Sequence, residues 1–419
     1  WRTCGGGIMS NWPLGIVSSA GGGQAFVGMQ LYGVGRDGGA LGTGDSGVPA
    51  RSTLIQVGVN ASGDFDPDAY DNIDMNINDI NSAGLIKDDG SLWTWGTKDG
   101  YMSGSNTTTD EPILRPTPTL IDSDPYDNFP NYVIDSKGVS LIYDGGKLFT
   151  SGMATEGGKG DTTSGTRYSP VQIATGITNW KNVFRDEGNN NCIAITDDGK
   201  AYAWGSNTMG QLGINTILNT SVPTQIGTDT DWLMFNLGDR FTFGIKTNGT
   251  MWAFGQHGEY RLGVGSSIAY EEKVLTPMQV GSASDWVHCS LSGDGGFALK
   301  SDGTLHCWGE VGNGFFGDNA ATGTTNRTPI QMGSDSDWYD ISCGKGQVAV
   351  AIKQNGTAWA WGADTFGQHG MNTYGVNRSV PTQIGTDNHW HRCWVATGHT
   401  YLGKQEEATN TTDLWYELS

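Results

Sequence analysis

A short run near the end of the sequence contains residue types that could form a metal-binding site. His389, His391 and Cys393 occupy alternate positions, so on a β-strand they would point to one face, where imidazole and thiolate groups could bind zinc. The run lacks further ligands at a recognised spacing. The histidine–cysteine pairs at 288–289 and 306–307 place successive side chains on opposite strand faces. We therefore expect buried free thiols, no metal centre and no cofactor.

A second candidate for metal binding is the densest acidic segment of the chain. Asp64, Asp66 and Asp68 alternate and could offer carboxylate oxygens to a calcium ion. Pro67 interrupts the run, and Met75 stands at the twelfth position, where an EF-hand loop has a bidentate glutamate. A solvated acidic loop is the expectation, and calcium binding stays open as the alternative.

Catalytic motifs are incomplete throughout the chain. The run Gly44-Asp-Ser-Gly-Val48 matches a nucleophile elbow only in part and has no strand–turn–helix context. The glycine-rich stretches at 5–7 and 21–23 lack the Lys-Ser/Thr pair of a phosphate-binding loop. Since no set of titratable groups converges in the pattern, we predict that the protein is not an enzyme and has no catalytic residues.

Composition excludes several classes of partner. The 419 residues carry 24 Lys+Arg against 44 Asp+Glu, a formal net charge of −20, so nucleic acid and anionic membrane surfaces are disfavoured. No apolar run is long enough for a membrane-spanning helix, so we expect no membrane insertion. The 65 glycines, with abundant Asn, Thr and Asp, disfavour long helices. The elements that position any site must therefore be strands and turns.

An internal repeat reveals those elements. A short run that ends in glycine recurs every 50 to 61 residues: at residues 31–35, 92–96, 148–152, 201–205, 251–255, 305–309, 358–362 and, altered, 414–418. A period of this length without helical stretches indicates a propeller or a β-solenoid. In the clearest unit, strands at 232–235, 241–245 and 251–255 are followed by a long polar loop and a fourth strand at 276–280. Four antiparallel strands per repeat form a propeller blade.

Turns and aromatic residues support this interpretation. The dipeptide Asn248-Gly249 predicts a type I′ hairpin between the second and third strands, and Asp198-Gly199 stands at the same place in the preceding unit. Alternate aromatic residues such as Trp359 and Trp361 share one strand face and should fill the space between neighbouring blades.

The repeats also resemble those of a known family. The unit that begins at residue 180 contains Ala201-Tyr-Ala-Trp-Gly205, Asn207-Thr-Met-Gly-Gln-Leu-Gly213 and Pro223-Thr-Gln-Ile226. These motifs resemble the regulator-of-chromosome-condensation repeat, in particular bacterial and phage members. The resemblance implies a propeller, with seven blades as the family number. Function does not follow from it, because such scaffolds carry unrelated activities.

The domain organisation expected from counting is a single propeller that covers residues 1–419. The repeat units are approximately 12–69, 70–125, 126–179, 180–231, 232–285, 286–337, 338–389 and 390–419. Eight units favour eight blades, and seven blades is the alternative. We expect the N- and C-terminal segments to close the ring. The fold class is therefore all-β, with four-stranded antiparallel blades.

The variable loops are the expected site of function, because they sit on a rigid ring with little chemistry of its own. Loop aromatics are candidate anchors for a partner, although they could equally pack between blades: Tyr101, Tyr260, Tyr270, Phe315, Phe316, Phe366 and Tyr374. We expect a non-catalytic interaction or structural module that binds protein partners.

The expected setting is a tailed-phage virion or a cell surface. Low lysine, the acidic balance and the repeat type are similar to surface and virion proteins, so the partners could be other virion or surface proteins and the location extracellular or virion-associated. The alternatives are a secreted, enzyme-inhibitor-like binder and a small-GTPase exchange factor, both of which the family resemblance implies.

Overall fold

The strands observed in the described parts of the chain follow the expected repeat. The computed structural model describes residues 26–36, 41, 50–57, 74–77, 82–86, 92–98, 113–122, 131–135, 138–143, 145–152, 155–163, 165–185, 190–265, 269, 272–319 and 324–407. These residues form β-strands and two short 3-10 turns, η1 (Thr155–Gly157) and η2 (Gly258–Tyr260). None of the helical segments in these ranges has the length and apolar character needed to cross a membrane.

Six blades are built from consecutive strands. Blade 1 contains β3 (Asp74–Ile77), β4 (Ser82–Ile86), β5 (Leu92–Lys98) and β6 (Ile113–Asp122), and blade 2 contains β7 (Asn131–Asp135), β8 (Gly138–Tyr143), β9 (Lys147–Gly152) and β10 (Arg167–Ile173). Blade 3 contains β11 (Trp180–Arg185), β12 (Asn191–Thr196), β13 (Ala201–Gly205) and β14 (Thr220–Gln225), and blade 4 contains β15 (Trp232–Leu237), β16 (Phe241–Lys246), β17 (Met251–Gln256) and β18 (Lys273–Gln279). Blade 5 contains β19 (Trp286–Leu291), β20 (Gly295–Lys300), β21 (Leu305–Val311) and β22 (Thr324–Gln331), and blade 6 contains β23 (Trp338–Gly344), β24 (Val348–Lys353), β25 (Ala358–Gly362) and β26 (Arg378–Gln383).

The seventh sheet, the closing blade, joins the two ends of the chain. Its order is β2 (Ala50–Gln56), β1 (Phe26–Arg36), β28 (His399–Glu407) and β27 (Trp390–Val395), so both ends contribute two strands. The expected closure by terminal segments is confirmed. The described residues form seven sheets, so the favoured count of eight blades is corrected to the alternative of seven. The physical reason is that the last repeat unit completes the sheet of the first unit and forms no blade of its own.

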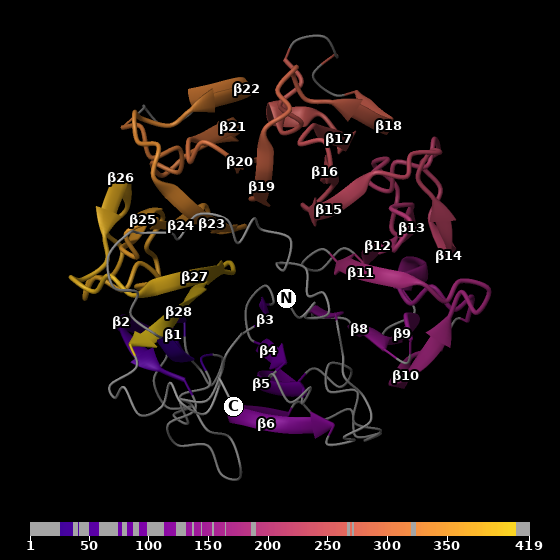
Figure 1. The fold of residues 1–419 in the computed structure, drawn as a ribbon, viewed down its shortest axis with the longest axis horizontal. Coiled ribbons are helices and arrows are strands. Elements are labelled where there is room, and N and C mark those ends of the chain that lie inside the picture. The colour runs from indigo at the N-terminus through magenta and orange to yellow at the C-terminus, as the bar shows by residue number, and fades with distance from the viewer. Residues whose placement is uncertain are drawn as a thin grey trace, which may run out of the picture.

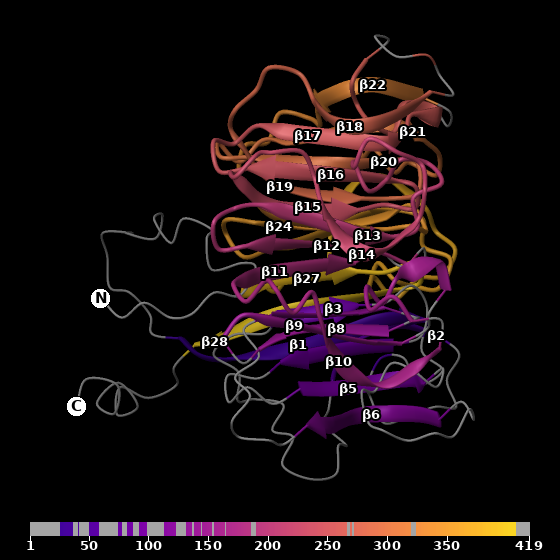
Figure 2. The same ribbon diagram turned by 90° about the vertical axis from the view of Figure 1, so that its right-hand side faces the viewer.

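The blades are arranged around a central axis (Figure 1). The first strand of each blade lies nearest the axis, and β11, β15, β19, β23 and β27 contact one another in turn. Seen edge-on, the blades form a thick disc (Figure 2). One face, the tight-turn face, carries the turns between second and third strands and the linkers between blades. The other, the long-loop face, carries the turns after the inner strands and the loops before the outer strands.

The hairpins of the tight-turn face differ in type from the expectation. Gly249 has φ +76°, whereas Asn248 is not among the positive-φ residues, so a type I′ turn is excluded. The Gly249 amide donates to the Lys246 carbonyl at 2.9 Å, and the Lys246 amide donates to the Thr250 carbonyl at 3.0 Å. These bonds describe a type I turn followed by a left-handed glycine. The Asn248 side chain accepts a hydrogen bond from the Thr250 amide at 3.1 Å, and this bond favours the type I turn.

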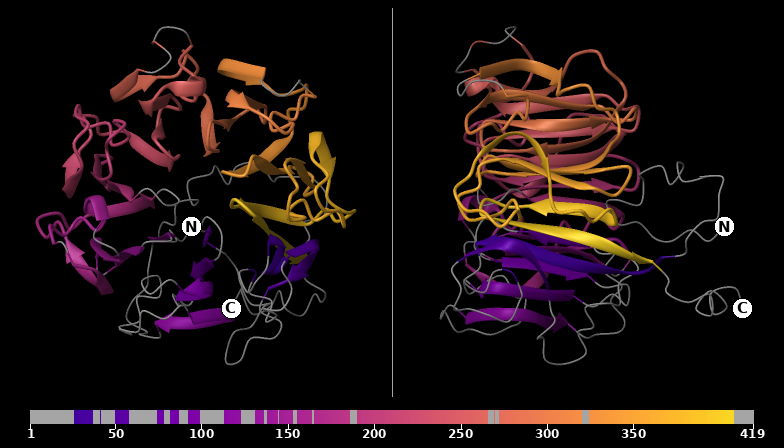
Figure 3. Two further views of the ribbon diagram at one scale, coloured as in Figure 1. Left: turned by 180° about the vertical axis from the view of Figure 1, so that it is seen from behind. Right: turned by 90° about the vertical axis from the view of Figure 1, so that its left-hand side faces the viewer.

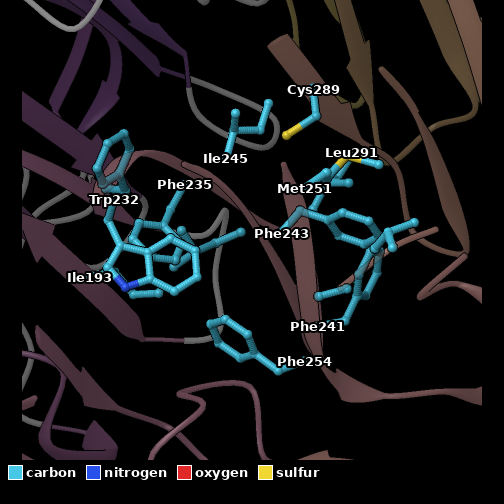
Figure 4. Close-up of a cluster of buried hydrophobic side chains, with 14 of the residues drawn as sticks. Ile193, Trp232, Phe235, Phe241, Phe243, Ile245, Met251, Phe254, Cys289 and Leu291 are labelled. Atoms are coloured by element: carbon cyan, nitrogen blue, oxygen red, sulfur yellow. The ribbon is translucent and has the colours of Figure 1, made fainter. Parts of the chain in front are cut away.

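The hydrophobic core lies between the blades rather than at the axis. One buried cluster contains Ile193 of blade 3, Phe235 and Phe254 of blade 4, and Leu291 of blade 5 (Figure 4). In blades 1, 3, 4, 5 and 6, the aromatic residue before the last glycine of the third-strand repeat is buried, as Trp308 and Trp361 illustrate. The expectation that these side chains fill the gaps between blades is therefore confirmed.

In blades 3, 5 and 6, a hydrogen bond from the buried tryptophan fastens the blade to the loop of the blade before it. Trp308 Nε1 donates to the Arg261 carbonyl at 2.9 Å, and Trp361 Nε1 donates to the Phe315 carbonyl at 2.8 Å. Trp204 makes the equivalent bond to the Gly158 carbonyl at 3.1 Å. Blade 4 has Phe254 at this position, and phenylalanine cannot donate such a bond.

The glycine that follows the tryptophan is a steric requirement. Gly205 has φ +103°, and a Cβ atom there would lie 1.8 Å from the Asn190 carbonyl oxygen. No other residue fits, because a side chain would overlap the preceding turn of the same blade. The long loop therefore always leaves the third strand from the same point, and this fixes where the loop side chains are presented.

Candidate interaction surface

The long-loop face is shaped by a loop motif that repeats from blade to blade. In blade 3 the Asn207 side chain accepts from the Leu212 amide at 3.0 Å and donates to the carbonyls of Thr216 at 2.8 Å and Leu218 at 3.1 Å. In blade 6 the buried Asp364 carboxylate accepts from the His369 amide at 3.0 Å in the same way. These bonds close each loop on itself, so its tip is held without help from a partner.

Two of the predicted anchors belong to the core. Phe315 is 0 % exposed and Phe316 is 3 % exposed, and both pack in the cluster between blades 5 and 6. Phe315 meets Phe297 edge to face, with ring centroids 5.0 Å apart. Their assignment as partner-binding residues is corrected, because a buried ring offers no surface to a partner. Tyr101 and Tyr270 lie outside the described residues.

The other three predicted anchors lie toward the surface of the long-loop face. Tyr374 is 54 % exposed, and its hydroxyl donates to the Ala50 carbonyl of the closing blade at 3.0 Å. Tyr260 and Phe366 are half-buried. The Arg327 guanidinium lies 4.5 Å from the Tyr260 ring centroid, and the Arg36 guanidinium lies 5.6 Å from that of Phe366. Each of these aromatics thus contacts the next blade.

Ion pairs near the axis also join blades on this face. Arg261 of blade 4 pairs with Glu259 and, at 2.7 Å, with Asp294 of blade 5. Lys345 of blade 6 pairs with Asp239 of blade 4 at 2.6 Å, across the turn of blade 5. Burial raises the pKa of Asp294 against the opposing effect of Arg261. The acidic groups of this region are therefore neutralised by basic partners within the disc.

Hydrogen bonds of side chains continue this cross-linking on the long-loop face. The Asn313 amide donates to the Gln347 side chain at 2.9 Å, and the Asn377 amide donates to Asn313 at 3.2 Å. On the other side of blade 4, Lys273 Nζ donates to the Thr208 carbonyl of blade 3 at 2.9 Å. Bonds of this kind hold loops of different blades in fixed relative positions.

The tight-turn face repeats one arrangement of lysine, tryptophan and aspartate. Lys246 Nζ lies 4.9 Å from the Trp232 ring centroid and 4.6 Å from that of Trp252, and it pairs with Asp229 and Asp231 at 2.7 and 3.0 Å. Blade 6 repeats the arrangement around Lys353, whose pKa burial tends to lower but Asp335 and Asp337 raise on balance. A lysine held by cation–π contacts and two carboxylates stabilises the edges of blades 4 and 6.

The inner strands bring together polar residues that the sequence did not single out as a group. Residue numbers 288, 340 and 392 differ by 52, and they place His288, Asp340 and Arg392 at equivalent positions of three consecutive inner strands. Asp340 accepts from the amides of Ile341 at 3.0 Å and Cys393 at 3.1 Å. This fixed spacing is the signal that could have revealed the group. Its bonds link one blade to the next, so we assign it a structural role.

The suspected metal ligands do not converge. His391 stacks against Tyr339, with ring centroids 5.3 Å apart, while the Cys393 thiol donates to the Val350 carbonyl at 3.2 Å. His389 instead contacts Asp387 at 3.1 Å. Across the described residues no group of three suitable ligands is found. The acidic segment at 64–73 lies outside the described residues. The five described cysteines are buried and form no disulfide with one another, and burial raises the pKa of Cys289 and Cys307 to about 12.

The sequence is similar to that of known repeat proteins. The profile of the regulator of chromosome condensation (RCC1) repeat matches residues 198–245. Mouse E3 ubiquitin-protein ligase HERC2 is 26 % identical over 238 residues, which cover 55 % of this chain and 5 % of HERC2. The mitochondrial RCC1 domain-containing protein RUG3 of Arabidopsis thaliana is 25 % identical over 309 residues, 71 % of this chain and 66 % of RUG3. The ultraviolet-B receptor UVR8 of the same plant is 27 % identical over 232 residues, 54 % of this chain and 50 % of UVR8.

These matches span less than two thirds of each of the three relatives. Among solved structures, Prp20p from Saccharomyces cerevisiae superposes with a TM-score of 0.77 at 14 % identity, over 94 % of this chain and 95 % of that chain. Human WBSCR16 superposes with a TM-score of 0.73 at 15 % identity, over 91 % and 100 %. At these identities the superpositions bear on the fold alone.

Proposed function

The chain belongs to the RCC1-like repeat family, and on that premise we propose that it is a non-catalytic module that binds a protein partner through its long-loop face. The observation that carries the proposal is a contrast within that face. Its loops are fixed to one another by bonds such as Asn313 to Gln347 and Arg261 to Asp294, yet their surface side chains differ from blade to blade. A rigid surface with individual side chains suits selective binding, because little conformational entropy is lost on association.

Exposed apolar side chains support the choice of this face. In blade 3, Ile217 and Leu218 are 45 % and 71 % exposed, and in blade 6, Tyr374 and Val376 are 54 % and 46 % exposed. All four stand in loops that lead into an outer strand. The tight-turn face, by contrast, presents the same lysine–aspartate arrangement in several blades. Repetition of one polar group offers little discrimination between partners.

A photo-crosslinking amino acid tests the proposal. Placed at Leu218 or at Tyr374, it should crosslink one and the same protein in the source organism, and placed at Asp302, on the tight-turn face, it should not. Equal yields from all three positions, or crosslinks from Asp302 alone, would contradict the proposed face. Finding no crosslinked protein at any of the three would contradict the proposed function.

The location outside a cell, on a virion or a cell surface, is part of the same proposal. Its support is compositional: few lysines, a net charge of −20 and many Asn, Thr and Gly residues. Mass spectrometry of purified particles and of surface fractions tests it directly. A chain found only inside intact cells would contradict it.

A small-GTPase exchange factor is the second candidate function. It is favoured by the dog X-linked retinitis pigmentosa GTPase regulator, which is 33 % identical over 85 residues, 20 % of this chain and 8 % of that protein. An exchange factor would speed the release of labelled nucleotide from a small GTPase. No acceleration across a panel of GTPases would leave only the first proposal.

A further inference from the structure

Tyr260 occupies a backbone conformation that its counterparts in other blades reserve for glycine. Its φ is +55°, in the left-handed region, and the preceding Glu259 has the same φ. The equivalent residues of blades 3, 5 and 6 are Gly210, Gly314 and Gly367, with φ between +76° and +81°. A tyrosine in this region is strained, so the fold of the loop alone does not explain why the position holds an aromatic residue.

The strained tyrosine lies under an arginine of the neighbouring blade. η2 packs against β21 and β22 of blade 5, and from β22 the exposed Arg327 reaches over the Tyr260 ring, with 4.5 Å between guanidinium carbon and ring centroid. The Arg327 carbonyl also accepts from the Gly265 amide at 2.8 Å, which fixes the strand beside the loop. Arginine stacked on tyrosine is held in place while its N–H groups stay available to an acceptor.

The charges around this pair leave it basic. Glu259 and Asp294 are neutralised by Arg261, and Asp239 is neutralised by Lys345. Within the described residues, no acidic side chain forms an ion pair with Arg327 or with the exposed Arg240, which lies close enough to act on Asp294 electrostatically. Two guanidinium groups of this face thus have no ion-pair partner among the described residues, although the whole chain is acidic. The exposed Glu272, which acts electrostatically on the neighbouring His257, is an acidic side chain of the same loop that likewise forms no ion pair in the described part of the chain.

We propose that Tyr260 and Arg327 form a docking patch for an acidic segment of a protein partner, and that Arg240, on the same face, adds to its positive charge. This inference rests on the proposed function and names the chemistry of the partner. The guanidinium groups bind carboxylates of the segment, and the Tyr260 ring packs against its side chains. Arginine and tyrosine are the residue types that most often dominate binding energy, and a planar guanidinium matches a carboxylate with two parallel hydrogen bonds.

The experiment measures binding of a fluorescent hexaglutamate peptide by anisotropy at low and moderate salt. The wild-type chain should bind it in preference to hexaglutamine and hexalysine, and more weakly as salt rises. Arg327→Gln and Tyr260→Gly should each weaken binding by about tenfold or more, a loss typical of hot-spot residues. Tyr260→Gly should keep the fold, because glycine occupies this place in three other blades, and its melting temperature should be unchanged or higher.

Lys273→Gln is the matched control. It removes one positive charge from the same face, on the opposite side of blade 4, and should leave hexaglutamate binding within about twofold of the wild type. Equal losses in Arg327→Gln and Lys273→Gln would reduce the effect to net charge and overturn the patch, as would binding of hexaglutamine or hexalysine as tight as that of hexaglutamate. Crosslinks from Leu218 and Tyr374 that persist undiminished in Arg327→Gln would overturn this patch while leaving the proposed function intact.

Discussion

Trp390 of β27 and Tyr32 of β1 meet edge to face, with ring centroids 5.4 Å apart and an interplanar angle of 89°. They come from opposite ends of the chain. Within single repeat units the same place is held by Trp180–Tyr202, Trp232–Trp252, Trp286–His306 and Trp338–Trp359, at interplanar angles between 75° and 84°. The closing blade therefore rebuilds, from two separated segments, a contact that blades 3 to 6 each make locally.

The strands that carry this pair extend past it on the tight-turn side. Phe26 of β1 pairs with Glu407 of β28, whereas the second and third strands of the other blades turn back there (Figures 2 and 3). The long antiparallel pairing replaces the covalent turn of the other blades. Ring closure thus depends on strand pairing and on the Tyr32–Trp390 contact.

The first prediction concerns this contact. Trp390→Ala should lower the free energy of unfolding by about 3–5 kcal/mol, the usual loss for a buried tryptophan. A double-mutant cycle with Tyr32→Ala should give a coupling energy of about 0.5–1.5 kcal/mol, the value of an edge-to-face aromatic pair. Denaturant titrations of the four proteins provide the data. The cycle for Trp338 and Trp359 is the control, and a coupling near zero for the closing pair alone would contradict the role proposed for it.

The second prediction concerns the bond between blades 4 and 5. Trp308→Phe keeps a ring in the pocket but removes the donor to the Arg261 carbonyl, so it should destabilise the protein by about 1–2 kcal/mol. Trp359→Phe is the control, because its Nε1 donates to the half-buried Thr357 hydroxyl at 2.9 Å, and water can reach and replace that bond. Chemical denaturation should rank Trp308→Phe as the more damaging change. The opposite order would mean that packing, not the hydrogen bond, decides the effect.

Much of the fold could be predicted because the signals for strands and turns lie within a single repeat unit. The tryptophan at the start of five inner strands, the Asn-Gly or Asp-Gly turn and the glycine that ends the third-strand repeat are local signals. Accordingly, β11, β15, β19, β23 and β27 begin at the expected residues 180, 232, 286, 338 and 390. The number of blades is not local. The blade count depends on which strands pair between the two ends of the chain. No motif in residues 26–36 indicates that this strand pairs with residues 399–407.

The candidate site was less predictable, because burial of a loop residue depends on the neighbouring blade. Phe316 stands where the motif has Leu212 and Leu262, both buried, so aligning the loop motif across blades could have placed Phe316 in the core. Phe315 aligns with Arg261 and is buried by contacts of its own with Phe297. Arg327 escaped notice because its significance lies in stacking on Tyr260 across a blade boundary, which no pattern within one unit encodes.

The third prediction concerns the exposed edge of blade 3. The Val222 amide donates to the Thr220 hydroxyl at 3.3 Å, and the Val222 carbonyl accepts from the hydroxyls of Thr220 and Thr224, each at 3.1 Å. Threonine side chains thus occupy backbone groups that an edge strand would otherwise offer to another chain. The double variant Thr220→Val/Thr224→Val should associate at concentrations where the wild type is monodisperse.

Light scattering at rising concentration measures this association. The control is Thr216→Val, which alters a threonine of the preceding loop and leaves the edge bonds in place. A double variant that stays as dispersed as the control would show that the outer strand is protected by other means, such as Pro223 within the same strand.

The last prediction concerns the acid stability of the closing blade. His399 begins β28 fully buried, both ring nitrogens lack a hydrogen-bond partner, and its ring lies edge-on to Tyr401 at 5.6 Å. Burial, with a smaller effect of Arg36, lowers the pKa of His399 to about 4. Since the unfolded chain binds this proton near pH 6.5, the stability contributed by neutral His399 is complete above pH 6.5 and is lost as pH falls toward 4. The loss reaches about 3 kcal/mol from this residue.

His399→Phe should remove this pH dependence without disturbing the blade, because Phe241 stands at the equivalent start of β16 and is also fully buried. Free energies of unfolding measured from pH 8 to pH 4 should fall less steeply in the variant, and the two curves should run parallel above pH 6.5. His369, whose pKa burial lowers to about 4 in blade 6, remains in both proteins and keeps part of the slope. Curves that stay parallel down to pH 4 would mean that His399 takes up its proton without opening the closing blade.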